Sequence, residues 1–164
     1  MAGTVAIGIQ QFNEIRKKGY FYIDKTAFIR EWWEKGDSVT LITRPRRFGK
    51  TLSMSMVEQF FSVKYAGQQN LFEGLAIWET KAYREIQGTY PVISLSFANL
   101  KEPSYELTRQ KVCDQLQQLY TEHAYILESG ILKGADKSFF ERMLHNEKVE
   151  YVDATLALYK LSSF

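Results

Sequence analysis

The segment from residue 38 to residue 61 constrains the fold more than any other part of the chain. Residues 38–43 form a short, β-branched and largely apolar run, which is typical of a buried parallel strand. A basic loop follows, and apolar residues then recur at helical spacing at Leu52, Met56, Val57, Phe60 and Phe61. A strand that leads through a loop into an amphipathic helix is the building unit of α/β folds.

A second β-branched run, residues 91–97, predicts another strand farther along the chain. Helical patterns lie before, between and after the two runs, so the sequence predicts an α/β fold in which helices flank a parallel sheet. We expect helices at about 12–18, 25–35, 52–64, 81–87 and 104–128, and two more that Asp136 and Asp153 cap; Asp24 is placed to cap the second. The length of 164 residues, without repeats, predicts one domain over residues 1–164.

The loop between the first predicted strand and its helix contains Gly49-Lys50-Thr51. In a phosphate-binding P-loop, successive main-chain N–H groups point into one concavity, and the positive end of the following helix dipole adds to the attraction. Gly49 would allow close approach of the backbone, Lys50 would reach the β- and γ-phosphates, and Thr51 would bind magnesium. The sequence therefore predicts binding of ATP or GTP with Mg²⁺.

The start of this loop departs from the usual pattern, which has glycine where this chain has Arg44. Arginine followed by Pro45 predicts a loop of different shape. Arg44, Arg46 and Arg47 could clamp phosphate through bidentate hydrogen bonds, contact a nucleic-acid backbone, or simply be solvated. The alternative to a nucleotide site is therefore a non-catalytic interaction module whose basic loop binds nucleic acid or a protein partner.

The loop also resembles the signature of the AAA-ATPase-like family of bacterial and archaeal proteins, in which an arginine-proline start replaces the first glycine. Residues 22–26, 71–75 and 90–93 resemble three further segments of that family. The resemblance implies a nucleotide site made of Arg44, Pro45, Arg46, Arg47, Phe48, Gly49, Lys50, Thr51 and Leu52, with Thr51 as the metal contact.

Members of this family are similar to P-loop ATPases with additional strands, and a nuclease-like domain of the PD-(D/E)XK type commonly follows. The resemblance implies a Walker B strand, which is an apolar run that ends in two acidic residues. No such run occurs in the sequence. We therefore expect a P-loop domain truncated before its Walker B strand, which binds nucleotide without hydrolysing it and self-associates through an incomplete sheet.

The bulk composition adds little to this prediction. With 21 basic and 19 acidic residues, the net charge of +2 favours neither a nucleic-acid partner nor a membrane surface. Cys113 is the single cysteine, the N-terminus does not resemble a signal peptide, and no apolar stretch reaches the roughly 20 residues that a membrane helix needs. These features predict a cytoplasmic protein.

Overall fold

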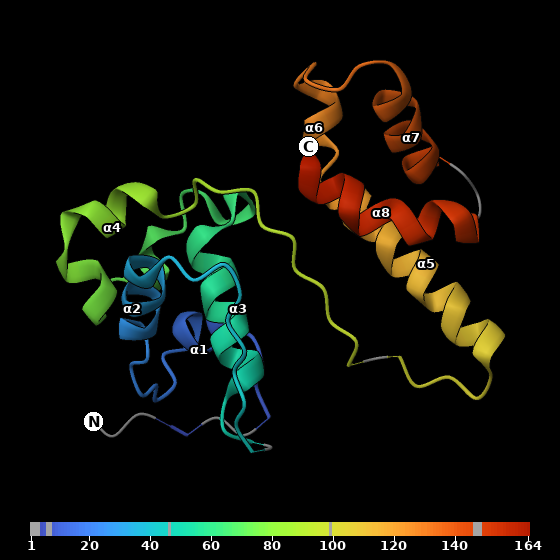
Figure 1. Ribbon diagram of the computed structural model, residues 1–164. Helices are drawn as coiled ribbons and strands as arrows, with labels where there is room; N and C mark the ends of the chain where they lie inside the picture. The colour runs from blue at the N-terminus through green and yellow to red at the C-terminus, as the bar shows by residue number, and fades with distance from the viewer. Residues whose placement is uncertain (1–3, 6–7, 46, 99, 146–148) are drawn as a thin grey trace. The chain divides into compact units, whose positions relative to one another are not determined.

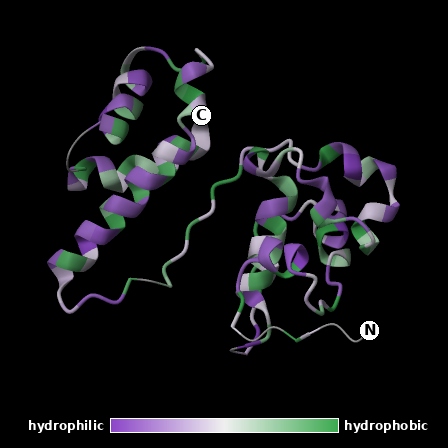
Figure 2. Cartoon of the chain, turned by 180° about the vertical axis from the view of Figure 1, so that it is seen from behind, coloured by the Kyte–Doolittle hydropathy of each residue, from purple (hydrophilic) through white to green (hydrophobic). Residues whose placement is uncertain are grey.

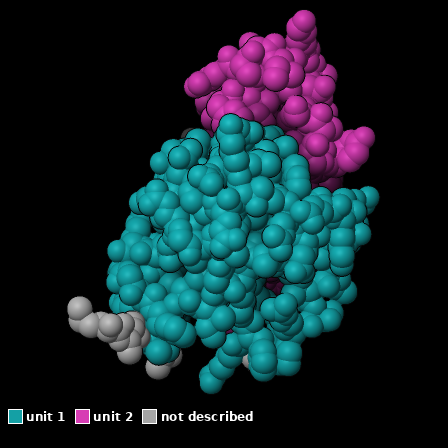
Figure 3. All heavy atoms as spheres, turned by 90° about the vertical axis from the view of Figure 1, so that its left-hand side faces the viewer, with its two compact units in different colours: residues 1–92 teal, residues 93–164 magenta. Residues whose placement is uncertain are grey.

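The computed structural model describes residues 4–5, 8–45, 47–98, 100–145 and 149–164 (Figure 1). The chain divides into two compact units, Met1–Val92 and Ile93–Phe164, which Figure 3 colours separately. Each unit has its own cluster of buried apolar side chains. None of the helices in the described ranges is both long enough and apolar enough to cross a membrane.

In its described residues, the first unit contains four α-helices and three short 3₁₀ turns. They are α1 (Phe12–Lys17), α2 (Ala27–Lys35), α3 (Lys50–Phe61), η1 (Val63–Tyr65), η2 (Gln69–Leu71), η3 (Ala76–Glu79) and α4 (Lys81–Ile86). Gly36 ends α2 in the left-handed conformation, with φ of 63°, which glycine adopts without strain. The sequence-based predictions of these four helices are confirmed to within about two residues at each end, apart from the last turn after α3.

The predicted parallel sheet is wrong. Within the described ranges, the structure has no named strand, and its β pairing outside strands is one isolated parallel bridge between Ser62 and Tyr90. Residues 38–43 and 91–97 are not helical, but they form no ladder with each other. Val39 and Leu41 are 86% and 83% exposed. A β-branched run indicates that a segment can lie in a sheet, but a sheet also needs neighbouring strands whose N–H and C=O groups it can pair with.

Aromatic side chains fill the core of the first unit. Phe72 lies at the centre, 5.2 Å from the ring of Phe12 and 5.1 Å from that of Phe60, and all three are fully buried. Figure 2 shows that hydrophilic and hydrophobic residues are mixed along the helices, as expected when each helix buries one face. Because Phe12 belongs to α1 and Phe60 to α3, the aromatic contacts fix these two helices against the 71–77 segment.

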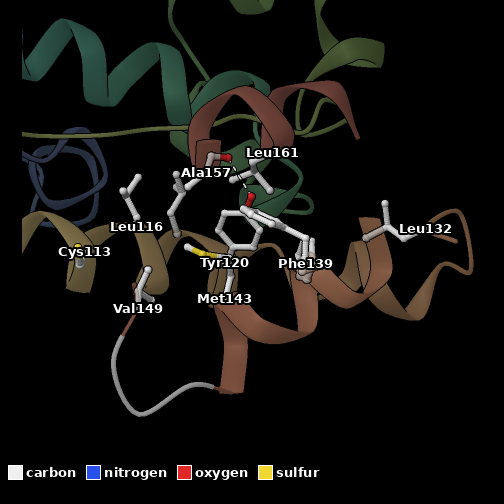
Figure 4. Close-up of a cluster of buried hydrophobic side chains, with 11 residues drawn as sticks. Cys113, Leu116, Tyr120, Leu132, Phe139, Met143, Val149, Ala157 and Leu161 are labelled. Atoms are coloured by element: carbon white, nitrogen blue, oxygen red, sulfur yellow. Dashed lines mark hydrogen bonds between the residues drawn. The ribbon is translucent and has the colours of Figure 1, made fainter. Parts of the chain in front are cut away.

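The described part of the second unit contains four helices, α5 (Tyr105–Glu122), α6 (Tyr125–Glu128), α7 (Gly134–His145) and α8 (Tyr151–Ser163). Their apolar faces meet around Tyr120, whose hydroxyl donates a hydrogen bond to the carbonyl oxygen of Ala157 at 2.9 Å (Figure 4). Burial raises the pKa of Tyr120 well above its ordinary value, so the hydroxyl remains a donor. Cys113 packs in the same core.

Three predictions for the second unit need correction. The helix predicted over 104–128 is broken, because α5 ends at Glu122 and α6 begins at Tyr125. His123 is the C-cap residue of α5, and its Nδ1 atom donates to the carbonyl oxygen of Leu119 at 2.8 Å. Asp136 and Asp153 are not helix caps. Both lie in the first turn of a helix, where a carboxylate is favoured, and they accept hydrogen bonds from Lys160 and Arg142.

Candidate phosphate-binding site

The basic loop of the sequence leads into α3 in an unusual backbone conformation. Arg47 and Gly49 both have positive φ, 68° and 73°. Gly49 is the N-cap of α3 and has no side chain with which to cap the helix, so the first main-chain N–H groups of α3 have no side-chain partner there. The first hydrogen bond within the helix runs from Ser53 N–H to the carbonyl oxygen of Gly49 at 2.8 Å. A helix N-terminus left open in this way attracts anions.

Lys50 folds back over the loop that precedes it. Its ammonium group donates hydrogen bonds to the carbonyl oxygens of Arg44 and Pro45, the second at 3.1 Å. These contacts bring the start of the loop and the start of α3 together around one positive charge. Because carbonyl oxygens are neutral acceptors, a phosphate oxygen would be a stronger partner for the same ammonium group.

The other predicted site residues lie on the same loop. Arg44, Pro45, Arg47, Phe48 and Thr51 are exposed and Leu52 is half-buried, whereas Arg46 lies outside the described residues. In the described part of the chain, no hydrogen bond or ion pair joins Thr51 to a carboxylate, and no group of three acidic, histidine or cysteine side chains gathers that could hold a metal ion. Magnesium at Thr51 would thus depend on phosphate and water oxygens for its other ligands.

The segment before α2 is tied to the segment around η3 by a small polar network. One carboxylate oxygen of Asp24 accepts hydrogen bonds from the main-chain N–H and the hydroxyl of Thr26, at 2.8 and 2.7 Å. The other accepts from Ala76 N–H at 2.8 Å, and the Thr26 hydroxyl oxygen in turn accepts from Ile77 N–H at 3.2 Å. Asp24 was predicted to cap α2, but Thr26 occupies the N-cap position, and Asp24 accepts hydrogen bonds from the main-chain N–H and the hydroxyl of Thr26.

The side chains of Tyr22 and Arg16 make further hydrogen bonds between segments of the first unit. Tyr22 donates from its hydroxyl to the sulfur of Met56, in α3, at 3.2 Å, and burial raises the pKa of Tyr22 to about 12, which keeps the donor protonated. Arg16 donates to the carbonyl oxygens of Leu71 and Glu73, at 2.8 and 2.7 Å. Sequence reasoning missed Arg16, because nothing in a basic residue at the end of a short helix indicates carbonyl partners 55 and 57 positions away.

A pocket of about 200 Å³ adjoins the basic loop. Its lining residues come from the region around the start of α2, the 38–43 segment, the loop and α3, and they are Lys25, Phe28, Ile42, Arg44 and Ser53. This pocket could not be predicted from the sequence, although Lys25 belongs to one of the segments that resemble the family.

A family model described as "Predicted AAA-ATPase" matches residues 6–153. This match includes the basic loop, the Asp24 network and most of the second unit. The chain belongs to the AAA-ATPase-like family. The resemblance drawn from the loop signature is thereby confirmed. Residues 22–26, 44–52 and 71–75, which carried part of that resemblance, all belong to the first unit.

One curated relative of this AAA-ATPase-like chain is an "Uncharacterized protein in vnfD 5′region" from Azotobacter chroococcum mcd 1. The two are 38% identical over 92 residues, which is 56% of this chain and 16% of the relative. The chain thus spans much less than the length of the relative that it matches. No solved structure matches the chain.

The Asp24 network leads to a prediction about stability. Replacing Asp24 with alanine should lower the free energy of unfolding of the first unit by about 1–2 kcal/mol, because it removes a partner of three donors at the start of α2. Asp37→Ala, which removes an exposed carboxylate with no such contacts, is the control. Urea denaturation followed by tryptophan fluorescence measures both; equal midpoints would show that the network does not stabilise the unit.

The same network predicts a dependence on pH. Partial burial alone would raise the pKa of Asp24, but the hydrogen bonds from Ala76 and Thr26 outweigh it and hold the pKa below its ordinary value. A lowered pKa in the folded state means that this contribution is complete above the unfolded pKa and is lost as the pH falls through the folded pKa. The difference in stability between the wild type and Asp24→Ala should therefore shrink in acid.

Proposed function

We propose that the chain binds a nucleoside triphosphate, ATP or GTP, through the loop from Arg44 to Leu52. The observation that carries the proposal is the open N-terminus of α3 behind Gly49, with the ammonium of Lys50 held at the same place by loop carbonyl oxygens. Main-chain N–H groups, a helix dipole and a lysine together form the arrangement that favours phosphate. Membership of a family described as predicted ATPases supports the same function.

The proposal is that these residues bind the nucleotide, and that they do not hydrolyse it on their own. Hydrolysis of the γ-phosphate needs an acidic or polar group that orients the attacking water and, with Mg²⁺, balances the developing charge. Neither Lys50 nor Thr51 forms a hydrogen bond or an ion pair with a carboxylate among the residues described. A phosphate-release assay with the 164-residue chain should therefore give a rate that Lys50→Ala does not lower.

A thermal-shift titration with ATP and Mg²⁺ tests the binding. A ligand that binds only the folded state stabilises it by about 2.7 kcal/mol at a hundred times its dissociation constant. Affinity should also fall as salt is raised, because the exposed Arg44 and Arg47 add positive charge around the site. An unchanged melting temperature at millimolar nucleotide would contradict the proposal.

The exposure of Arg44 and Arg47 favours one alternative, which is binding of a nucleic-acid backbone by the same loop. Titration with a short single-stranded oligonucleotide separates the two functions. If the nucleotide is the ligand, ATP should displace any bound oligonucleotide, and the melting temperature should respond to ATP but not to the oligonucleotide alone.

A further inference from the structure

Lys25 lies against the basic loop although it is far from it in sequence. A β-carbon placed on Gly49 would lie 3.4 Å from the ammonium nitrogen of Lys25. Lys25 also lines the 200 Å³ pocket together with Arg44 of the loop and Ser53 of α3. The ammonium group therefore lies beside the residue that opens the N-terminus of α3.

Positively charged groups gather around Lys25. The residue is half-buried, and among the described residues it forms no ion pair with a carboxylate. Lys50 and Arg44 bring charge of the same sign to the same loop, and the N-terminus of α3 adds a partial positive charge. Charges of one sign that gather in a partly desolvated place repel one another, and a bound anion reverses that balance.

The neighbours of Lys25 in sequence, Asp24 and Thr26, form hydrogen bonds that stabilise the fold. Asp24 and Thr26 bind each other and the main chain at Ala76 and Ile77, which fixes the backbone on both sides of Lys25. The main-chain carbonyl of Lys25 accepts from Phe28 N–H at 3.1 Å. The network thus holds the backbone at Lys25 in position, and the ammonium group of Lys25 lies beside Gly49.

We propose that Lys25 is a second phosphate-binding lysine, which contacts the polyphosphate of the nucleotide beside Gly49, in addition to Lys50. The inference rests on the proposed function, since it assigns a further residue to the same site. The ligand class is a polyphosphate chain: the contact requires phosphate oxygens next to Gly49 and does not require the base or the ribose.

Calorimetric titration of the 164-residue chain with two ligands tests this assignment. One ligand is ATP with Mg²⁺, and the other is inorganic tripolyphosphate, which lacks the nucleoside. Lys25→Gln should lower the affinities for both ligands by the same factor, roughly ten- to a hundredfold, because it removes one charge-assisted contact to phosphate. Lys25→Arg keeps the charge and should recover most of the affinity. Lys35→Gln, an exposed change of the same charge at the end of α2, should leave both affinities unchanged.

The outcomes separate this inference from the proposed function. If the wild type binds ATP and Lys25→Gln binds as tightly as Lys35→Gln, Lys25 is not a ligand and the inference is overturned. Loss of ATP binding with unchanged tripolyphosphate binding overturns it too, since Lys25 would then contact the nucleoside. If the wild type binds neither ligand, the proposed function itself fails. Thermal unfolding of each variant confirms that the folded state is compared.

Discussion

Replacing Lys50 with alanine is expected to lower the affinity for ATP roughly thirty- to a thousandfold, which corresponds to the loss of charge-assisted hydrogen bonds worth about 2–4 kcal/mol. The fold should persist. Among the described residues, the hydrogen bonds of Lys50 go to the carbonyl oxygens of Arg44 and Pro45 in an exposed loop, so its removal should change the free energy of unfolding by less than about 1 kcal/mol. Calorimetric titration gives the affinity, and urea denaturation gives the stability.

Lys35→Ala is the matched control for Lys50→Ala. It removes the same side chain from an exposed helix end away from the loop, so it reports the effect of one lost charge on a nucleotide attracted at long range. Equal affinities of the two variants for ATP would show that Lys50 does not bind the phosphates. A strong loss of stability in Lys50→Ala would instead show that the lysine serves the fold.

Replacing Phe72 with alanine is expected to destabilise the first unit by about 3–5 kcal/mol. Phe72 is fully buried and its ring contacts those of Phe12, Phe60 and Trp78, so alanine leaves a cavity where α1, α3 and η3 meet. The three tryptophans of the chain lie at positions 32, 33 and 78, all within the first unit. Tryptophan fluorescence during urea denaturation therefore reports the unfolding of that unit.

Phe48→Ala makes the same chemical change at a side chain that is 60% exposed in the basic loop. It should alter the free energy of unfolding by no more than about 0.5 kcal/mol. If Phe72→Ala and Phe48→Ala had similar midpoints, the aromatic cluster could not be what fixes α3, and the position of Gly49 and Lys50 would need another explanation.

Helices of the first unit could be predicted from the sequence because their signals are local. The spacing of Leu52, Met56 and Phe60 gives α3 its buried face, and Gly36 supplies the left-handed residue that ends α2. The sheet could not be predicted in the same way. Residues 38–43 and 91–97 have strand composition, yet pairing depends on segments far away in the chain, and in the described part neither run belongs to a named strand.

The same distinction between local and distant contacts holds for the candidate site. Gly49 and Lys50 could be assigned from the sequence, since the glycine, the lysine and the helix that follows are adjacent. The contacts of Lys25 and Arg16 could not be predicted from the sequence. Each of these side chains lies beside residues more than 20 positions away, and only the fold brings them together. The resemblance to a family marked the segment that contains Lys25, but it did not indicate what the lysine contacts.

The most direct test of phosphate binding at this loop is an NMR titration of ¹⁵N-labelled chain with ATP and Mg²⁺. The open N-terminus of α3 predicts that the largest chemical-shift changes occur at the main-chain N–H groups of Gly49, Lys50 and Thr51, and that inorganic tripolyphosphate shifts the same signals. Saturating nucleotide that shifts other residues and leaves these three N–H groups unchanged would contradict the account.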